Sequence, residues 1–196
     1  MNPVDLAEVF ESAVPWWHVI SLRNRFYLRN FVETGTGYGD TAYIASTKFK
    51  KVYTIDINPD VYENQRPWLK AATNVFRFLG DSVVQLPSIL STLDAPTFFY
   101  LDGHWTGQQK PQPDCECPLL EELALICSRP QVARDVIMID NWGMMKHPPN
   151  PPHAPAKWPK AHQVIEAILS RCGLCVMEYL DTLIATPESV IAEHKG

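Results

Sequence analysis

The chain has 196 residues, with 17 lysines and arginines against 22 aspartates and glutamates, and a net charge of -5 at pH 7. This length suits one domain with a sizeable core, so we expect a single domain over residues 1–196. The sequence has no basic block that would neutralise a phosphate backbone and no apolar run long enough to span a bilayer, which argues against nucleic acid and membrane as partners. No basic segment followed by an apolar run opens the chain, so we expect a soluble, cytoplasmic protein.

The first two thirds of the chain predict alternating strands and helices. Apolar residues at mixed helical spacing in residues 3–28 predict an N-terminal helical cap, 1–28. The predicted strands that follow are 29–34, 52–56, 75–79, 97–102 and 135–140, and the predicted helices between them are 40–48, 60–71, 82–92 and 118–127. Strands that alternate with helices indicate βαβ units and a parallel sheet.

The last third begins with a segment rich in proline. Residues 143–159 fit no regular element, and a long loop inside a compact domain is usually a lid or a binding loop, so we expect a lid here. Residues 160–172 predict a helix that ends at Gly173, and residues 174–179 and 182–186 predict a closing hairpin.

The cysteines do not form a recognisable framework. They are five in number and scattered, so we expect reduced thiols rather than disulfides. Cys115 and Cys117, with His104 near them in sequence, could suggest zinc, but structural zinc pairs usually leave two to four residues between the cysteines and this pair leaves one.

Each of the five predicted strands ends in or leads to a carboxylate. These residues are Glu33, Asp56, Asp81, Asp102 and Asp140. Ligands of open α/β sheets bind beyond the carboxyl ends of the strands, so acids at these positions indicate the charge of the ligand, which should be complementary to theirs. We expect a ligand that carries positive groups or that binds through a metal.

A glycine-rich turn joins the first strand to its helix and reads Glu33-Thr-Gly35-Thr-Gly37-Tyr-Gly39-Asp40. A dinucleotide fingerprint needs a third small residue where this chain has Asp40, and that carboxylate would repel a pyrophosphate, which argues against NAD. The pattern E-x-G-x-G-x-G resembles motif I of the class I S-adenosylmethionine-dependent methyltransferases. The resemblance covers about residues 29–186, because the acids after the later strands fall in the same order.

The resemblance implies a fold and a cofactor site. The fold is α/β, a Rossmann-like, mostly parallel sheet of seven strands in the order 3-2-1-4-5-7-6, with the last strand antiparallel and helices on both faces. The residues that would bind S-adenosylmethionine are Glu33, Gly35, Thr36, Gly37, Asp56, Ile57, Asp81, Ser82 and Asp102. Among them, Asp56 would meet the ribose hydroxyls and Asp81 the adenine amino group.

The resemblance also implies a transfer site. Asp102, Asp140 and Asn141 are similar to the metal triad of the catechol O-methyltransferase type, which would hold magnesium through oxygen ligands. Asp102 and His104 would be the catalytic residues, with His104 as the base that removes the proton of the acceptor hydroxyl. The segments around Leu101, Cys117 and Ile139 look more like a group of bacterial methyltransferase-like proteins of poorly defined substrate than like the catechol enzymes.

Tryptophan and methionine residues in the two loops beside this site predict a pocket for a small acceptor with an aromatic or sugar-like hydroxyl. They are Trp105, Trp142, Met144, Met145 and Trp158, and some of them must pack the loops onto the body. Nothing in the sequence predicts an oligomeric state.

Structural interpretations of the same residues stay open. The glycines could make only a tight turn, Asp56 could be a turn acid and Asp81 a helix N-cap. His104 could bond only to its own loop, and Asp140-Asn141 could only turn the chain. Glu121 and Glu122 are expected to form a solvated helix face, with the alternative that one of them reaches the site. Other functional alternatives are a cofactor-binding protein without methyl transfer, a metal-dependent oxidase of the cephalosporin-hydroxylase-like kind and, less favoured, a nicotinamide-dependent oxidoreductase.

Overall fold

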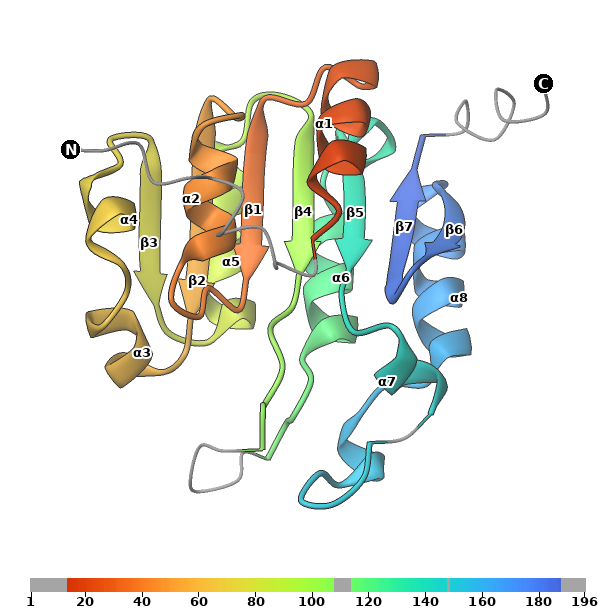
Figure 1. Ribbon diagram of the computed structural model, residues 1–196. Coiled ribbons are helices and arrows are strands. Elements are labelled where there is room, and N and C mark those ends of the chain that lie inside the picture. The colour runs from red at the N-terminus through yellow and green to blue at the C-terminus, as the bar shows by residue number, and fades with distance from the viewer. Residues whose placement is uncertain (1–13, 108–113, 148, 188–196) are drawn as a thin grey trace.

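The computed structural model describes residues 14–107, 114–147 and 149–187 (Figure 1). The helices are α1 (Trp16–Arg25), α2 (Asp40–Ser46), α3 (Pro59–Glu63), α4 (Pro67–Ala71), α5 (Ser82–Thr92), α6 (Leu119–Cys127), α7 (Gly143–Lys146) and α8 (Ala161–Cys172), with 3-10 turns η1 (Val132–Arg134) and η2 (Pro155–Lys157). The strands are β1 (Asn30–Thr34), β2 (Lys51–Asp56), β3 (Val75–Leu79), β4 (Thr97–Leu101), β5 (Val136–Ile139), β6 (Cys175–Tyr179) and β7 (Thr182–Thr186). Of the expected N-terminal cap, α1 is present, and residues 1–13 lie outside the described residues.

The seven strands form one sheet in the order β3-β2-β1-β4-β5-β7-β6. Strands β1 to β5 pair in parallel, and β7 runs antiparallel to both β5 and β6. The expected strand order and the antiparallel last strand are confirmed. Figure 1 shows that the carboxyl ends of β1 to β5 point to the same edge of the sheet, where α7 and the loops after β4 and β5 lie.

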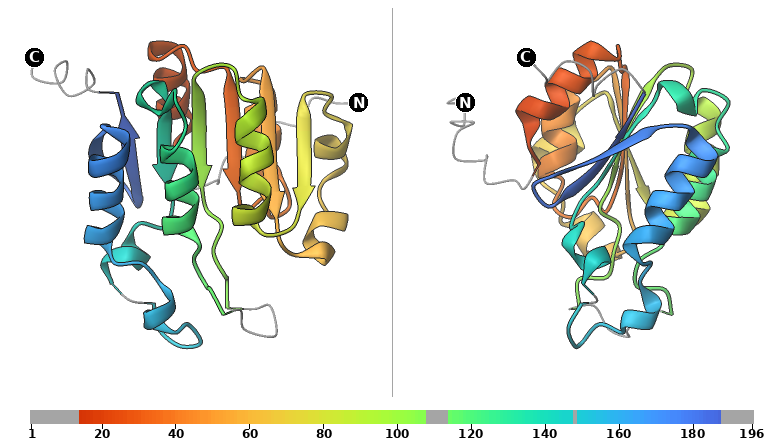
Figure 2. Two further views of the ribbon diagram at one scale, coloured as in Figure 1. Left: turned by 180° about the vertical axis from the view of Figure 1, so that it is seen from behind. Right: turned by 90° about the vertical axis from the view of Figure 1, so that its right-hand side faces the viewer.

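Helices cover both faces of the sheet, as Figure 2 shows from behind and from the side. Successive side chains of a strand point to opposite faces, so β4 supplies both cores: Phe98 and Tyr100 pack with α1 and α2, while Phe99 and Leu101 pack with α5, α6 and α8. All residues of β1, β4 and β7 are buried, which explains why their sequences do not alternate between apolar and polar residues.

Two predicted elements differ from the observed ones. The predicted helix 60–71 is two short helices, because Pro67 forces the preceding Arg66 into an extended conformation with ψ 138°. The segment 143–159, expected to hold no regular element, begins with α7 and contains η2, while the rest of its described residues are irregular.

The cysteines also differ from the expectation. The structure joins Cys127 at the end of α6 to Cys172 at the end of α8 in a disulfide, so the prediction of five reduced thiols is wrong for this pair. The two cysteines are 45 residues apart in sequence, and their pairing depends on how two helices pack, so the sequence alone did not indicate it. Cys115, Cys117 and Cys175 are free thiols.

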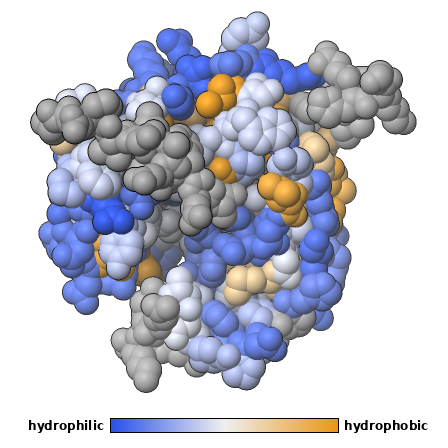
Figure 3. Space-filling model, in the orientation of Figure 1, coloured by the Kyte–Doolittle hydropathy of each residue, from blue (hydrophilic) through white to orange (hydrophobic). Residues whose placement is uncertain are grey.

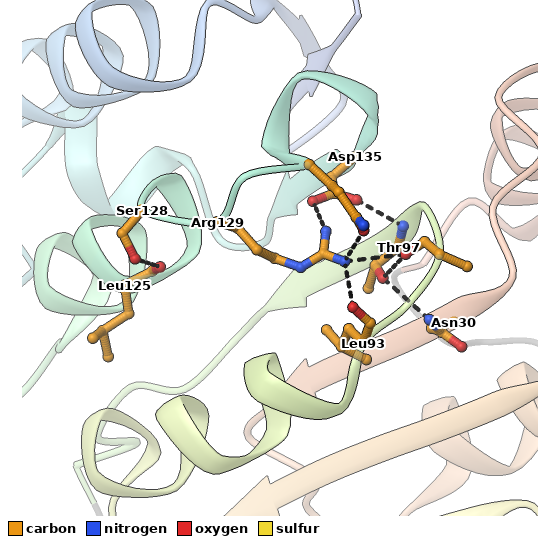
Figure 4. Close-up of polar contacts among 9 residues, drawn as sticks. Asn30, Leu93, Thr97, Leu125, Ser128, Arg129 and Asp135 are labelled. Carbon is orange, nitrogen blue, oxygen red and sulfur yellow. Dashed lines mark hydrogen bonds and ion pairs between the residues drawn. The ribbon is translucent and has the colours of Figure 1, made fainter.

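A buried ion pair closes the amino end of the sheet (Figure 4). The Arg129 guanidinium donates to the Asp135 carboxylate and, at 3.2 Å, to the carbonyl oxygens of Leu93 and Ala95. The other oxygen of Asp135 accepts the Thr97 backbone N–H at 2.8 Å. These bonds tie the loop before β4 to the start of β5.

One face of the molecule is mostly polar. In Figure 3 the visible face is largely hydrophilic, with separate apolar patches. The exposed large apolar residues are scattered along the chain, for example Tyr27, Ile57, Val84 and Leu180. None of the helices in the described residues is long and apolar enough to cross a membrane.

Candidate functional site

The glycine turn after β1 lies against the end of β4. Gly35 has φ +83°, and a Cβ at this position would lie 2.4 Å from the carbonyl oxygen of Asp102, so a residue with a side chain does not fit. Gly37 also has positive φ, but open space surrounds the place where its Cβ would be. The turn therefore packs tightly on one side and leaves room on the other for a ligand to approach the backbone.

Glu33 lies within β1 rather than after it, and its side chain is fully buried. The Thr54 hydroxyl donates to its carboxylate at 2.5 Å, and the Thr36 hydroxyl lies 2.5 Å from that of Thr54. Burial raises the pKa of Glu33 well above its usual range, the Thr54 bond opposes the rise, and the charges of Asp102 and Asp56 add to it. A positive ligand placed here would reverse that effect and favour the carboxylate.

Asp56 ends β2 and holds the glycine turn. Its two oxygens accept the backbone N–H groups of Gly37 and Asn58, both at 2.9 Å. Burial raises the pKa of Asp56, and these two hydrogen bonds oppose the rise. Asp56 is thus a turn acid, as the structural interpretation has it, but it also brings its carboxylate to the glycine turn, where a ribose would be expected. The neighbouring Ile57 is 66% exposed and offers an apolar surface beside it.

Asp81 is the N-cap of α5, since its Oδ1 accepts the Val83 backbone N–H at 2.8 Å. The structural interpretation is therefore right for one oxygen of this carboxylate. Asp81 is exposed at the carboxyl end of β3, next to the half of the edge that Asp56 occupies, while Ser82 is buried. The position is compatible with a contact to adenine.

The end of β4 brings together three of the predicted site residues. Asn141 Nδ2 donates to Asp102 Oδ1 at 2.9 Å, and the Nδ1 atom of His104 lies 3.3 Å from the same oxygen. Asn141 has φ +54°, a left-handed conformation that asparagine tolerates better than most residues, and this turn directs its amide toward Asp102. Asp102 therefore orients both His104 and Asn141.

Asp140 bonds to a residue that the sequence did not single out. The buried Tyr100 hydroxyl donates to Asp140 Oδ2, and the Asn141 backbone N–H donates to Oδ1 at 2.9 Å. Burial, and then the charge of Asp140, raises the pKa of Tyr100, so this hydroxyl stays protonated. Tyr100 and Asp140 lie on adjacent strands, but only the packed sheet brings their side chains together.

The metal triad fits this arrangement poorly. Both Asp140 oxygens accept hydrogen bonds, and Asn141 turns its donor group, not its carbonyl oxygen, toward Asp102. Within the described residues there is also no group of three or more histidine, cysteine, aspartate or glutamate side chains that could hold a metal ion. We therefore derive no chemical step through a metal.

Glu122 follows the less favoured of two expectations, that one of Glu121 and Glu122 reaches the site. We expected a solvated helix face for Glu121 and Glu122; Glu121 is exposed, but Glu122 is only 1% exposed and lines a cavity with Asp102, His104 and Asp140. Its Oε1 atom has no hydrogen-bond partner among the described residues. Burial raises the pKa of Glu122 to about 7, and the hydroxyls of Ser82 and Thr34 offset only part of that rise. The helical spacing of Leu119, Leu123 and Ile126 could have indicated that Glu122 shares the buried face.

The aromatic and methionine residues of the flanking loops mostly pack the loops onto the body. Trp142, Met145 and Trp158 are buried, whereas Trp105 and Met144 are partly exposed. Met145 still lines the cavity that contains Glu122. The structural interpretation thus holds for most of this group, and the site has a more polar wall than the sequence indicated.

Solved structures of methyltransferases have a similar fold. The O-methyltransferase TomG from Streptomyces achromogenes, solved with S-adenosylmethionine, is 16% identical with a TM-score of 0.62, and the match covers 86% of this chain and 78% of TomG. An O-methyltransferase from Bacillus cereus, solved with S-adenosylhomocysteine, is 15% identical with a TM-score of 0.65, and the match covers 95% of this chain and 93% of that one.

The chain has the class I methyltransferase fold. An rRNA methylase from Streptococcus thermophilus also has this fold, at 14% identity and a TM-score of 0.53, over 88% of this chain and 96% of that one. The fold therefore does not identify the methyl acceptor. No family model and no curated protein matches the sequence.

Proposed function

We propose that the protein is an S-adenosylmethionine-dependent methyltransferase that methylates a hydroxyl group of a small molecule. The observation that carries the proposal is the arrangement of the carboxyl edge, where the glycine turn, Glu33, Asp56 and Asp102 meet on the adjacent strands β2, β1 and β4. The O-methyltransferases of the same fold were solved with S-adenosylmethionine or its product, which supports this cofactor and this reaction class.

The cofactor half of the site would consist of Glu33, Gly35, Thr36, Gly37, Asp56, Ile57, Asp81 and Ser82, with Asp102 at its border. S-adenosylmethionine carries a sulfonium and an ammonium group and supplies an electrophilic methyl group when bound. Burial and mutual repulsion raise the pKa of Glu33, so this edge has unmet negative potential that a cation relieves. Glu33 and Asp56 would therefore bind the charged cofactor better than a neutral analogue.

The transfer half would consist of Asp102 and His104. With Nδ1 of His104 protonated and bonded to Asp102, the Nε2 atom has a free lone pair and can accept a proton. His104 would take the proton of the acceptor hydroxyl through Nε2. The bound cofactor would supply the methyl group to that oxygen, and its sulfur would keep the electron pair of the broken C–S bond and leave as a neutral thioether. The imidazolium that results is stabilised by the carboxylate of Asp102. Most of the remaining rate enhancement would come from holding the two reactants in line.

Asp140 and Asn141 would orient the acceptor side of the site through Asp102 and Tyr100. The alternative role, as magnesium ligands with Asp102, would require Asn141 to rotate its amide and Asp140 to leave Tyr100. Transfer that is unchanged after extensive treatment with EDTA would support the orienting role. Transfer that is lost with EDTA and restored by magnesium would support the metal triad instead.

The experiment that tests the proposed function is a calorimetric titration of the purified protein with S-adenosylmethionine, repeated with magnesium and with NAD. We expect micromolar binding of S-adenosylmethionine and none of NAD. Asp56→Ala should weaken this binding, whereas Asp140→Ala should keep it and lose transfer. If a folded wild-type protein does not bind S-adenosylmethionine, the proposed function is wrong, and normal transfer by Asp140→Ala would remove the role assigned to Asp140.

A further inference from the structure

A buried carboxylate lies between the loop after β4 and the Pro-rich loop that follows α7. Glu116 is 1% exposed, and its backbone oxygen accepts the Trp105 N–H at 2.7 Å. A charged group in such a place costs free energy unless hydrogen bonds compensate for the lost water. The neighbours of Glu116 therefore indicate why the chain keeps an acid here.

Hydrogen bonds from the Pro-rich loop compensate Glu116. Its Oε2 accepts Trp158 Nε1 at 2.7 Å and lies 3.2 Å from His153 Nδ1, while its Oε1 accepts the Ala154 backbone N–H at 3.0 Å. The donors lie 37 to 42 positions further along the chain. One carboxylate thus joins two loops that the sequence places far apart.

The rings bound to Glu116 stand beside the proposed base. The centroid of Trp158 lies 5.4 Å from that of His104, and His153 lies 5.4 Å from Trp158 and 5.2 Å from Trp105. His104 is thus placed between Asp102, whose Oδ1 lies 3.3 Å from its Nδ1 atom, and the indole of Trp158. A ring held on two sides has few orientations open to it.

Close backbone contact gives the two loops a second point of attachment. Gly107 has φ +83°, and a Cβ there would lie 3.2 Å from a ring carbon of Pro152 and 3.5 Å from His153 Nε2. The two loops therefore also meet where Gly107 lies against Pro152 and His153, and moving the Trp158 indole away from His104 would stretch its bond to Glu116.

We propose that Glu116 is a positioning residue of the transfer site: it holds Trp158 against His104 and so fixes the imidazole in the orientation in which Nε2 faces the acceptor. This inference rests on the proposed function, because it assigns Glu116 a role toward the base of that reaction. Glu116 is not one of the acids at the strand ends. Replacing it should therefore slow methyl transfer without changing the affinity for the cofactor.

The test uses Glu116→Gln and Trp158→Phe in the full chain, with Glu121→Gln as the matched control because Glu121 is an exposed acid a few residues away. The glutamine keeps the volume but places an NH2 group among N–H donors. The phenylalanine keeps a ring but removes the bonded N–H. Proton NMR of the His104 ring, assigned with a His104→Gln variant, reports the position of the indole through its ring current and needs no acceptor.

We expect the His104 ring signal to move toward that of an exposed histidine in Glu116→Gln, to move less in Trp158→Phe, and to stay in place in Glu121→Gln. With a simple catechol as the acceptor probe, kcat should fall on the order of 10- to 100-fold in Glu116→Gln, the loss typical of misplaced groups. The dissociation constant for S-adenosylmethionine should stay within about twofold of the wild-type value, since the side chain of Glu116 bonds to the Pro-rich loop and not to the proposed cofactor residues.

An unchanged His104 signal in both Glu116→Gln and Trp158→Phe would overturn the proposal. If Glu116→Gln does not fold, Trp158→Phe decides alone, because it removes a single hydrogen bond. Failure of the proposed function would be visible separately, as absence of S-adenosylmethionine binding by the wild-type protein, whereas failure of this inference leaves that binding intact.

Discussion

The two ends of the sheet differ in how they compensate a buried carboxylate. At the amino end, Asp135 is buried against Arg129, and each of its oxygens accepts a hydrogen bond (Figure 4). At the carboxyl end, no lysine or arginine of the described residues forms an ion pair with Glu33, Asp56 or Glu122.

This difference suggests that the paired acid serves the stability of the fold and the unpaired acids serve ligand binding. Burial raises the pKa of Glu33, Asp56 and Glu122, and it also raises the pKa of Asp135 to about 6, but only at Asp135 does a cation, Arg129, offset part of the rise. A protein that needed only stability would gain from replacing the unpaired acids, while a site for a positive ligand needs them. Changes to the Arg129–Asp135 pair should therefore lower stability, whereas changes to the buried, unpaired acids Glu33 and Glu122 should lower binding or transfer more than stability.

The largest expected effect is at the amino end. Arg129→Met should lower the free energy of unfolding by about 3–5 kcal/mol, because it leaves the Asp135 carboxylate buried without its cation. Urea denaturation followed by circular dichroism measures the change. The double variant Arg129→Met/Asp135→Asn should recover part of the loss, and a loss below about 1 kcal/mol in the single variant would contradict a structural role for the pair.

At the carboxyl end, Glu122→Gln should change the pH dependence of stability. The pKa of Glu122 is about 7 in the folded protein and near 4.5 when unfolded, so the folded state binds the extra proton and wild-type stability falls as the pH rises from 4.5 to 7. The fall amounts to roughly 3 kcal/mol for this one group, and the glutamine variant should lack it.

The measurement is the free energy of unfolding from pH 4 to pH 8 for wild type, Glu122→Gln and the exposed control Glu121→Gln. A constant offset between wild type and Glu122→Gln is expected from altered hydrogen bonding of the amide and carries no information on charge. Parallel curves for these two proteins over the whole range would show that Glu122 does not titrate as inferred.

A smaller effect should separate the two roles of Asp81. Asp81→Ala removes the N-cap of α5 and should cost about 1 kcal/mol of stability, whereas Asp81→Asn keeps a good cap and should cost much less. Both variants should weaken S-adenosylmethionine binding if the charge of Asp81 meets the adenine amino group. Wild-type affinity in Asp81→Asn, measured by calorimetry, would leave Asp81 as a cap only.

The sequence predicted the features that depend on neighbours along the chain. Apolar runs placed the strands, and the glycine turn with the acids at the strand ends indicated the class of fold. Glu116, Tyr100 and the buried face of Glu122 depend on segments that meet only in the folded protein. No local pattern distinguishes the buried Glu122 from the exposed Glu121 beyond its helical phase, and nothing near Cys127 indicates Cys172.

The hydrogen bonds of Glu116 have a consequence for grafting loops between proteins of this fold. The loop after β4 and the Pro-rich loop interlock through one side chain, so they behave as a single module although more than thirty residues separate Glu116 from His153. Grafting only one of them from a methyltransferase of the same fold would leave either the carboxylate or its donors without a counterpart. Acceptor preference should therefore be transferable between scaffolds only when both loops move together.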